Sequence, residues 1–117
     1  METLFVYAGE KLMAKAAKPI LLSGIQPSGQ LCIGNYLGAV KNHIAAQDEH
    51  ECFYFIASYH ALDTTKDRGA LRKNIIDAAI TYYSLGLDPQ KAAFWVQPDL
   101  PEVTELCWLL SSVTGIG

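Results

Sequence analysis

Short apolar runs alternate with longer amphipathic stretches along this chain of 117 residues. The apolar runs predict three strands, at residues 19–23, 52–57 and 93–97. Apolar residues at helical spacing predict three helices, over residues 34–48, 68–85 and from Pro101 onward. The second run is continuously apolar, which is typical of a strand covered on both faces of a parallel sheet. The order predicts an α/β fold, an incomplete three-layer, Rossmann-like parallel sheet with right-handed crossovers.

Each predicted helix carries an apolar stripe that we expect to be buried. The stripes are Leu37, Val40 and Ile44; Leu71, Ile75, Ala78, Ala79 and Tyr82; and Val103, Leu106, Cys107 and Leu110. Asp67 is the expected N-cap of the second helix, and Gly86 is placed to be the left-handed residue that ends it. Pro101 is expected at the first position of the third helix, where its missing N–H does no harm.

Composition narrows the class of protein. Half of the residues are hydrophobic, so a packed domain is expected, and the net charge of −3 argues against a general nucleic-acid-binding surface. The three cysteines, at positions 32, 52 and 107, include no Cys-x-x-Cys pair, which favours free thiols and a reducing, cytoplasmic location. No apolar run reaches the ~18 residues of a membrane span, so no membrane association is expected.

Other residue types suggest no further site. His43 and His50 have no metal-ligand company, so both are predicted to be solvated, and no metal site is expected. Trp95 and Trp108 are expected in the core or at a subunit interface. Residues 1–17 are predicted to form an N-terminal extension, with Met13 as the natural start, ahead of a domain over residues 18–117.

Residues 23–39 are the candidate functional segment, because they predict a strand, a glycine-containing turn and a helix start. In open α/β sheets, ligands bind beyond the carboxyl ends of the strands, and helix N-termini favour anions. The same Pro-Ser-Gly sequence is also ordinary turn chemistry, so the pattern alone leaves both interpretations open. It is neither a Walker loop, which needs Gly-Lys-Ser/Thr, nor the dinucleotide Gly-x-Gly-x-x-Gly motif.

Three segments carry a resemblance to tryptophanyl-tRNA synthetases. Gly24-Ile25-Gln26-Pro27-Ser28-Gly29 followed by Ile33-Gly34-Asn35-Tyr36-Leu37-Gly38-Ala39 resembles that family's variant of the class I "HIGH" motif. Ser58-Tyr59-His60-Ala61-Leu62 resembles a second family segment, and Phe94-Trp95-Val96-Gln97 with Pro101-Glu102 a third. The resemblance covers about residues 19–117. It implies the N-terminal half of a nucleotide-binding catalytic domain, and about the first third of a complete synthetase.

The resemblance implies a reaction in which the tryptophan carboxylate attacks the α-phosphate of ATP, with Mg²⁺ accompanying the nucleotide, before transfer to tRNA(Trp). The implied ATP-binding residues are Gln26, Pro27, Ser28, Gly34 and Asn35, with Ser28 and Asn35 as the catalytic donors. The implied tryptophan-binding residues are Leu22, Gly24 and His60. The family also implies a homodimer for the complete protein.

Two positions depart from the family pattern. Cys32 stands where the family usually has histidine or threonine, and a thiol is a weak donor. Ser58 stands where aspartate is common, which weakens the polar support of that loop. Without the family, His60 would be interpreted as a structural residue as readily as a ligand-binding one.

The sequence leaves two other functions open. One is a nucleotide-binding fragment without turnover, and the other is a different class I enzyme, tyrosyl-tRNA synthetase being nearer than a nucleotidylyltransferase. The "KMSKS" loop and the anticodon-recognising domain of a synthetase are not found in the sequence. We therefore expect this chain alone to bind ATP weakly. A three-strand unit also leaves a sheet edge and apolar helix faces uncovered, so we expect the chain to be poorly stable and to self-associate.

Overall fold

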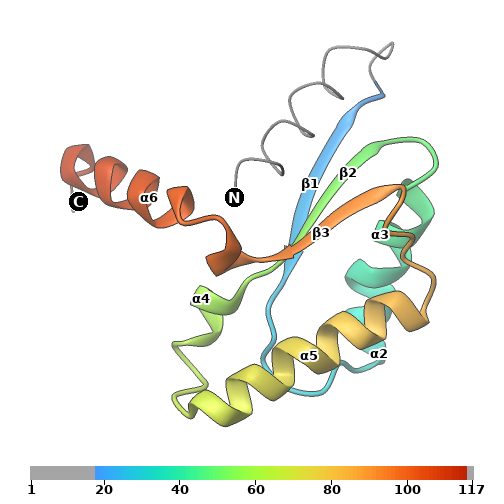
Figure 1. Ribbon diagram of the computed structural model, residues 1–117, viewed down its shortest axis with the longest axis horizontal. Coiled ribbons are helices and arrows are strands. Elements are labelled where there is room, and N and C mark those ends of the chain that lie inside the picture. Colours follow the sequence, from blue (N-terminus) through green and yellow to red (C-terminus); the bar gives the residue numbers. More distant parts are fainter. Residues whose placement is uncertain (1–17, 116–117) are drawn as a thin grey trace.

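The computed structural model describes residues 18–115, so the predicted N-terminal extension and Met13 lie outside the described residues. Three strands form one parallel sheet in the order β1-β2-β3 (Figure 1). They are β1 (Ile20–Ile25), β2 (Glu51–Ile56) and β3 (Ala92–Val96). The three predicted strands are confirmed, although β1 continues two residues further into the candidate segment than predicted.

The predicted helices are confirmed as well, with two short additions. A continuous helical segment comprises α2 (Ile33–Asn35), the π-helical turn η1 (Tyr36–Val40) and α3 (Lys41–Ala46). The other helices are α4 (Ser58–Ala61), α5 (Arg68–Ser84), the 3₁₀ turn η2 (Gln97–Asp99) and α6 (Glu102–Val113). The sequence did not predict α4 and η2, because each is a single turn that follows a strand.

Among the described residues the sheet is covered on one face only. Along β2, Cys52, Tyr54 and Ile56 are buried, whereas the residues between them are half-buried. Figure 1 shows α3 and α5 on the same side of the sheet, and Leu22, on the other side, is 64 % exposed. The prediction of a strand covered on both faces is therefore wrong for residues 18–115, which form two layers of the predicted incomplete Rossmann-like sheet.

The direction of the connections explains this one-sided cover. Both crossovers step the same way across the sheet, from β1 to β2 and from β2 to β3. Crossovers of one hand that step in one direction place their helices on one face. We call the uncovered side the open face and define it by Leu22, Gly24, Phe53, Phe55 and Trp95, which alternate with the buried residues of their strands.

The covered face holds the core. Val40, Tyr54, Ile56, Ala78 and Tyr82 each keep about 1 % of their surface exposed. The stripe predicted for the second helix is confirmed in α5, where Ala78 and Tyr82 are buried and its other members are half-buried. In the first helical segment Val40 is buried and Ile44 half-buried, but Leu37 is 56 % exposed, so its predicted burial is wrong.

Both ends of α5 form as predicted. The Asp67 carboxylate accepts the Ala70 N–H at 2.7 Å, which caps the first turn. Gly86 has a φ of 110°, and its N–H donates to the Tyr83 carbonyl at 3.2 Å. The Leu87 N–H donates to the Tyr82 carbonyl at 3.1 Å, completing a Schellman motif, and Leu87 itself is buried.

The prediction for the third helix is wrong in two respects. Helix α6 begins at Glu102, so Pro101 is its N-cap and not its first residue. All of its residues are exposed, including the stripe that was predicted to be buried. Figure 1 shows α6 projecting away from the sheet. Trp108 is 76 % exposed and lies outside the core, whereas Trp95 is half-buried against Phe55. Within residues 18–115, no helix combines the length and apolar character needed to cross a membrane.

The predictions for His43 and His50 also need correction. His43 is not solvated: it is 7 % exposed and hydrogen-bonded to two side chains. His50 is half-buried, and its Nδ1 atom has no hydrogen-bond partner among the described residues. His43 lies three residues after Val40, so helical spacing could have placed it on the buried side of the helix.

Candidate functional site

The candidate site lies at the carboxyl ends of the three strands. Because all three strands are parallel, the turn after β1, helix α4 after β2 and turn η2 after β3 leave the sheet at the same edge (Figure 1). This is the edge at which open α/β sheets bind ligands. The structure therefore brings the three segments that carry the family resemblance to one edge.

Two glutamine side chains join these segments. Gln26 Nε2, after β1, donates to the His60 carbonyl of α4 at 3.2 Å. Gln97 Oε1, after β3, accepts the Tyr59 N–H of α4 at 3.1 Å. Helix α4 is thus held from both sides, by residues 34 and 38 positions away in the sequence. We call these two hydrogen bonds the glutamine ties.

The turn after β1 is tight and is anchored at one residue. The Ser28 N–H donates to the Gln26 carbonyl at 3.0 Å, a bond that spans only three residues and forms a γ-turn centred on Pro27. Pro27 is among the most buried side chains, whereas Ser28 is exposed. Gly29 has a φ of 138°, which a residue with a side chain rarely adopts. The turn therefore presents Ser28 to solvent from a fixed base.

The start of the following helix is organised by Asn35. Cys32 is extended and occupies the N-cap position, and its N–H donates to Asn35 Oδ1 at 2.9 Å. This back-bond is one half of a capping box. Because Oδ1 is used in this way, the amide nitrogen of Asn35 remains as a donor at the positive end of the helix. The N–H groups of Asn35 and Gly34 beside Cys32 lower the pKa of its thiol.

Gly34 has no internal reason to be glycine. A Cβ built there would meet only Cys32 Sγ, at 3.6 Å, an ordinary contact. Its φ is not positive, since only Gly29 and Gly86 have positive φ among the described glycines. The residue is exposed at the helix start, so the surface beside it is open to close approach by a ligand.

Gly24, in contrast, is needed by the sheet itself. It pairs with Phe55 of β2, and a Cβ at Gly24 would lie 2.8 Å from the Phe55 ring and 3.0 Å from its carbonyl oxygen. Leu22 lies two residues earlier on the same side of β1 and is exposed. His60, at the end of α4, is exposed and contributes its carbonyl to a glutamine tie. Leu22 and Gly24 thus share the open face, and His60 lies beside the turn that follows them.

Ser58 is the one polar side chain of this edge that is buried without a partner. It is 4 % exposed, and its Oγ atom has no hydrogen-bond partner within residues 18–115. This position departs from the family pattern, in which aspartate is common. The buried hydroxyl, without a partner among the described residues, belongs to the first residue of α4.

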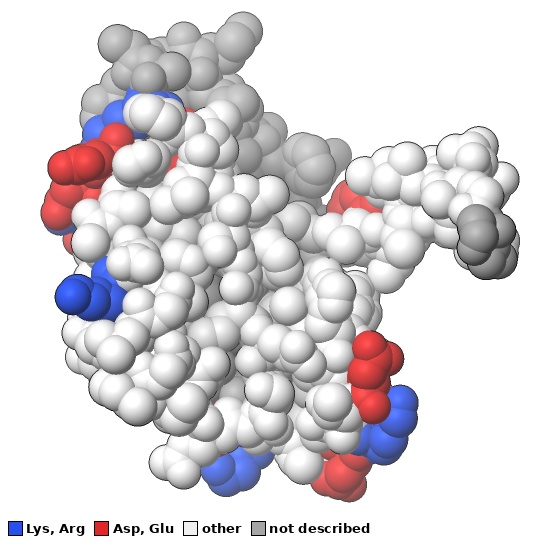
Figure 2. Space-filling view, turned by 180° about the vertical axis from the view of Figure 1, so that it is seen from behind, with Lys and Arg blue, Asp and Glu red and all other residues white. Residues whose placement is uncertain are grey.

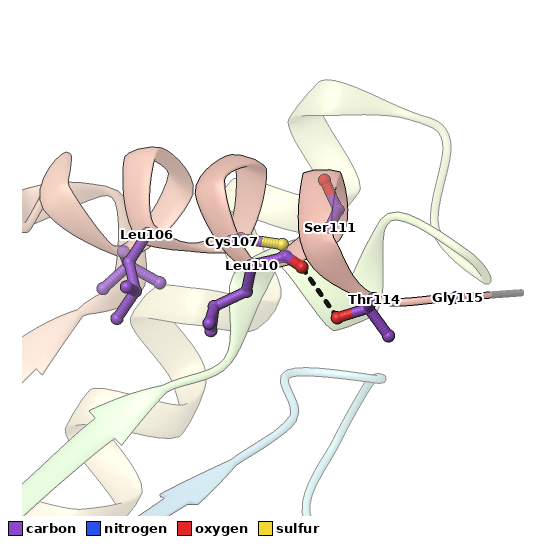
Figure 3. A pocket seen from close by; sticks show the side chains of 7 residues that line it. Leu106, Cys107, Leu110, Ser111, Thr114 and Gly115 are labelled. Carbon is purple, nitrogen blue, oxygen red and sulfur yellow. Dashed lines mark hydrogen bonds between the residues drawn. The ribbon is translucent and has the colours of Figure 1, made fainter.

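Two hollows mark the described surface, and the smaller one borders the candidate segment. One, of about 280 Å³, lies beside the helix start between Cys32, Tyr36 and Leu85. The larger, of about 640 Å³, runs along one side of α6 and is lined by residues that include Leu106, Cys107 and Leu110 (Figure 3). Since residues of α6 and the segment just after it form all of its lining, it is an exposed helix face.

Among the described residues, the face of the molecule shown in Figure 2 has no cluster of charged side chains at its middle. In Figure 2 the charged side chains lie at the margins, and uncharged surface fills the middle. Residues 18–115 contain no group of three or more His, Cys, Asp or Glu placed to hold a metal ion. The recognisable features of the site are therefore neutral donors, a helix start and an apolar sheet face.

The parallel sheet, with candidate binding residues at the carboxyl ends of its strands, defines an α/β protein of the Rossmann-like class. The family model described as "tRNA synthetases class I (W and Y)" matches residues 14–117. The chain belongs to this family of class I tRNA synthetases.

Relatives and solved structures agree with that assignment. The chain is 50% identical over 97 residues to tryptophan–tRNA ligase of Campylobacter jejuni (strain RM1221), covering 83% of this chain and 30% of the relative. It is 52% identical over 97 residues to tryptophan–tRNA ligase of Rhodopirellula baltica, with the same coverage of 83% and 30%. The chain thus spans about a third of the length of these relatives.

Two solved structures show the same arrangement of elements. One is tryptophanyl-tRNA synthetase of C. jejuni complexed with ADP and tryptophan, with a TM-score of 0.77, 50% identity and coverage of 82% of this chain and 30% of that one. The other is the Mycoplasma pneumoniae enzyme, with a TM-score of 0.77, 36% identity and coverage of 82% and 29%. The predicted family is therefore confirmed, and so is the Rossmann-like α/β fold.

Sequence reasoning missed the internal roles of three site residues. Gln26 and Gln97 were quoted for their resemblance, but their hydrogen bonds to α4 join segments far apart in the chain. Asn35 was expected only as a donor to a ligand, and it also caps its own helix. The spacing of Asn35, three residues after Cys32, fits the capping-box pattern and could have signalled this role.

Proposed function

We propose that this chain supplies the first third of a tryptophan–tRNA ligase and carries one side of its ATP and tryptophan sites. The observation that carries the proposal is the common edge of the sheet, where the Gln26–Asn35 turn, α4 and η2 meet and the glutamine ties hold them together. The C. jejuni relative, similar over this same region, was solved with ADP and tryptophan.

In the proposed ATP site, Gln26, Pro27 and Ser28 line the turn and Asn35 donates from the helix start. Phosphate oxygens gain negative charge as the tryptophan carboxylate attacks and pyrophosphate leaves. The free amide nitrogen of Asn35, the Ser28 hydroxyl and the helix end all place positive potential there. Gly34 is exposed and has no Cβ, so it leaves room for the adenosine beside the helix start.

In the proposed tryptophan site, Leu22 and Gly24 form part of the floor and His60 part of the wall. Leu22, Phe55 and Trp95 make the open face apolar and aromatic, which suits an indole ring. Mg²⁺ would arrive with the nucleotide phosphates, since the described residues offer no carboxylate cluster for it. We further propose tRNA(Trp) as a substrate, a homodimer for the complete protein, and the cytoplasm as its location.

The isolated chain should differ from a full-length ligase in nucleotide binding and in activity. Its relatives are about three times longer, and Leu22 on the open face is 64 % exposed. We expect weak binding of ATP and no adenylate formation at the rate of a full-length ligase. Nucleotide titration of the isolated chain, with tryptophan-dependent pyrophosphate exchange measured beside it, tests both statements.

A chimera gives the sharpest test of function. Residues 19–115 replace the matching segment of the C. jejuni ligase, and tryptophan-dependent ATP–pyrophosphate exchange is measured. We expect activity in the chimera, and a loss of roughly 10²–10³ in rate with Asn35→Ala, as for one lost transition-state donor. Asn42→Ala, on an exposed position of α3, is the matched control and should leave the rate unchanged.

The same assay separates the alternatives. Exchange that depends on tyrosine instead of tryptophan would favour a tyrosine enzyme. Nucleotide binding by a well-folded chimera without exchange for either amino acid would favour a binding fragment without turnover. An Asn35→Ala chimera as active as its Asn42→Ala control would remove Asn35 from the proposed catalytic donors.

A further inference from the structure

His43 lies where four elements of the covered face meet. It belongs to α3, and its Nδ1 atom is 2.9 Å from the Tyr82 hydroxyl of α5. Its Nε2 atom is 3.0 Å from the Ser23 hydroxyl of β1. The ring stacks on Tyr54 of β2, with centroids 4.4 Å apart and an angle of 17° between the planes. One buried imidazole thus joins two helices to two strands.

When the His43 ring is neutral, both of its nitrogen atoms have a hydrogen-bond partner. A neutral imidazole has one N–H donor and one acceptor nitrogen, and each hydroxyl can donate or accept. Either tautomer can therefore make both hydrogen bonds. The Tyr54 hydroxyl donates to the His43 carbonyl at 2.9 Å, which holds the backbone of α3 at the same point.

The protonated ring has no charged partner there. The titratable groups that face it are Tyr82 on α5 and Tyr54 on β2, with Cys52 of β2 in contact with the Tyr54 hydroxyl at 3.1 Å. Burial raises the pKa of Tyr82 to about 12, and burial together with the Cys52 contact raises the pKa of Tyr54. Both phenols therefore stay neutral, and within residues 18–115 no carboxylate is hydrogen-bonded to the ring. β1 offers only the Ser23 hydroxyl.

The bond to Ser23 connects this cluster to the candidate site. Ser23 immediately precedes Gly24, and β1 ends one residue before Gln26, which makes a glutamine tie. We propose that His43 is a positioning residue for this site: through the Ser23 hydroxyl it holds β1 in register behind the Gln26 turn, and this hold weakens when the buried ring takes up a charge that no partner balances. The proposal rests on the proposed function for the identity of the site, but not for the coupling of His43 to β1.

The direction of the pH effect follows from burial. Burial lowers the pKa of His43 below the value of 6.5 that it has when unfolded. Between the two pKa values the unfolded chain binds the proton more strongly, so stability rises with pH across that window. The contribution of His43 is fully present above pH 6.5 and is lost as the pH falls through the folded pKa.

An NMR titration of the isotope-labelled chain tests the coupling without any ligand. Imidazole and amide signals are followed from pH 8 to pH 5. We expect the His43 ring to titrate below pH 6.5 and the amides of residues 23–25 to shift with the same midpoint. In His43→Phe, which keeps a ring of similar shape, those amides should lose that transition.

Ser23→Ala is the second variant and removes only the hydroxyl. The His43 ring should still titrate below pH 6.5, while the amides of residues 23–25 no longer follow it. The proposal is overturned if those amides follow the ring as well in Ser23→Ala as in the unchanged chain, or if they keep their transition in His43→Phe.

Failure of the proposed function would look different. If the β1 amides follow His43 but the chimera activates no amino acid at any pH, the positioning role stands and the proposed function fails. If the chimera is active and its pH profile is identical with Phe at position 43, the function stands and the positioning role fails.

Discussion

Helices α5 and α6 differ in what they contact, although both carry apolar residues at helical spacing. Ala78 and Tyr82 of α5 are buried against the sheet. Seven of the twelve residues of α6 are apolar, yet all of its residues are exposed. Apolar spacing therefore predicted both helices correctly, but it predicted burial correctly only for α5.

Chain connectivity accounts for the difference. Helix α5 connects β2 to β3, and a crossover between neighbouring parallel strands must lie on the sheet. Helix α6 follows the last described strand, so no strand pairing returns it to the sheet. Its apolar side, lined by Leu106, Cys107 and Leu110, is left as an exposed face (Figure 3). Apolar spacing predicts which side of a helix favours burial. The connections of the chain decide whether that side packs against the sheet.

The largest expected effect is in the last turn of α5. Tyr82→Ala removes a ring that is 1 % exposed and hydrogen-bonded to His43, so the free energy of unfolding should fall by about 3–5 kcal/mol. Tyr83→Ala is the matched control, because the neighbouring ring is 45 % exposed, and its loss should cost only about 1 kcal/mol. Urea unfolding followed by circular dichroism measures both, and equal losses would contradict the contrast.

The second effect concerns association through α6. We expect the chain to self-associate, and Leu106→Asp should weaken association roughly tenfold or more, since a buried leucine is worth about 1.5–3 kcal/mol. Thr104→Asp adds the same charge to α6 away from the apolar side and should have little effect. Sedimentation velocity measures both; a monodisperse monomer for the unchanged chain would refute the expectation.

A third, smaller effect lies at the N-terminus of α5. Asp67→Ala removes the carboxylate that accepts the Ala70 N–H, so the chain should be destabilised by about 1 kcal/mol. Asp63→Ala changes an exposed carboxylate outside the helix and serves as the control. The midpoints of urea unfolding should separate the two variants, and identical midpoints would show that the cap contributes nothing.

The smallest expected effect is at the most exposed ring of α6. Trp108 is 76 % exposed, so Trp108→Ala should change the free energy of unfolding of the monomer by no more than about 0.5 kcal/mol. The measurement is made at a concentration below that of self-association. A loss of unfolding free energy as large as that of Tyr82→Ala would show that α6 is packed in solution, and would contradict the contrast between α5 and α6.

Some parts of the candidate site could be predicted from the sequence and others could not. The Gln26–Asn35 segment could be located from its strand, turn and helix-start pattern, and the family from its motif residues. The hydrogen bonds of His43 could not be predicted, because its partners Ser23 and Tyr82 are 20 and 39 residues away. The glutamine ties are equally non-local.

The sequence by itself determined the elements, the caps of α5 and the family, because periodicity, capping and motif spacing act within a few residues along the chain. Only the tertiary structure decided which face of the sheet is covered, that α6 stands free, and that Gln26 and Gln97 hold α4 at the site. Those outcomes depend on the direction of the crossovers and on contacts between segments far apart in sequence, which no local pattern specifies.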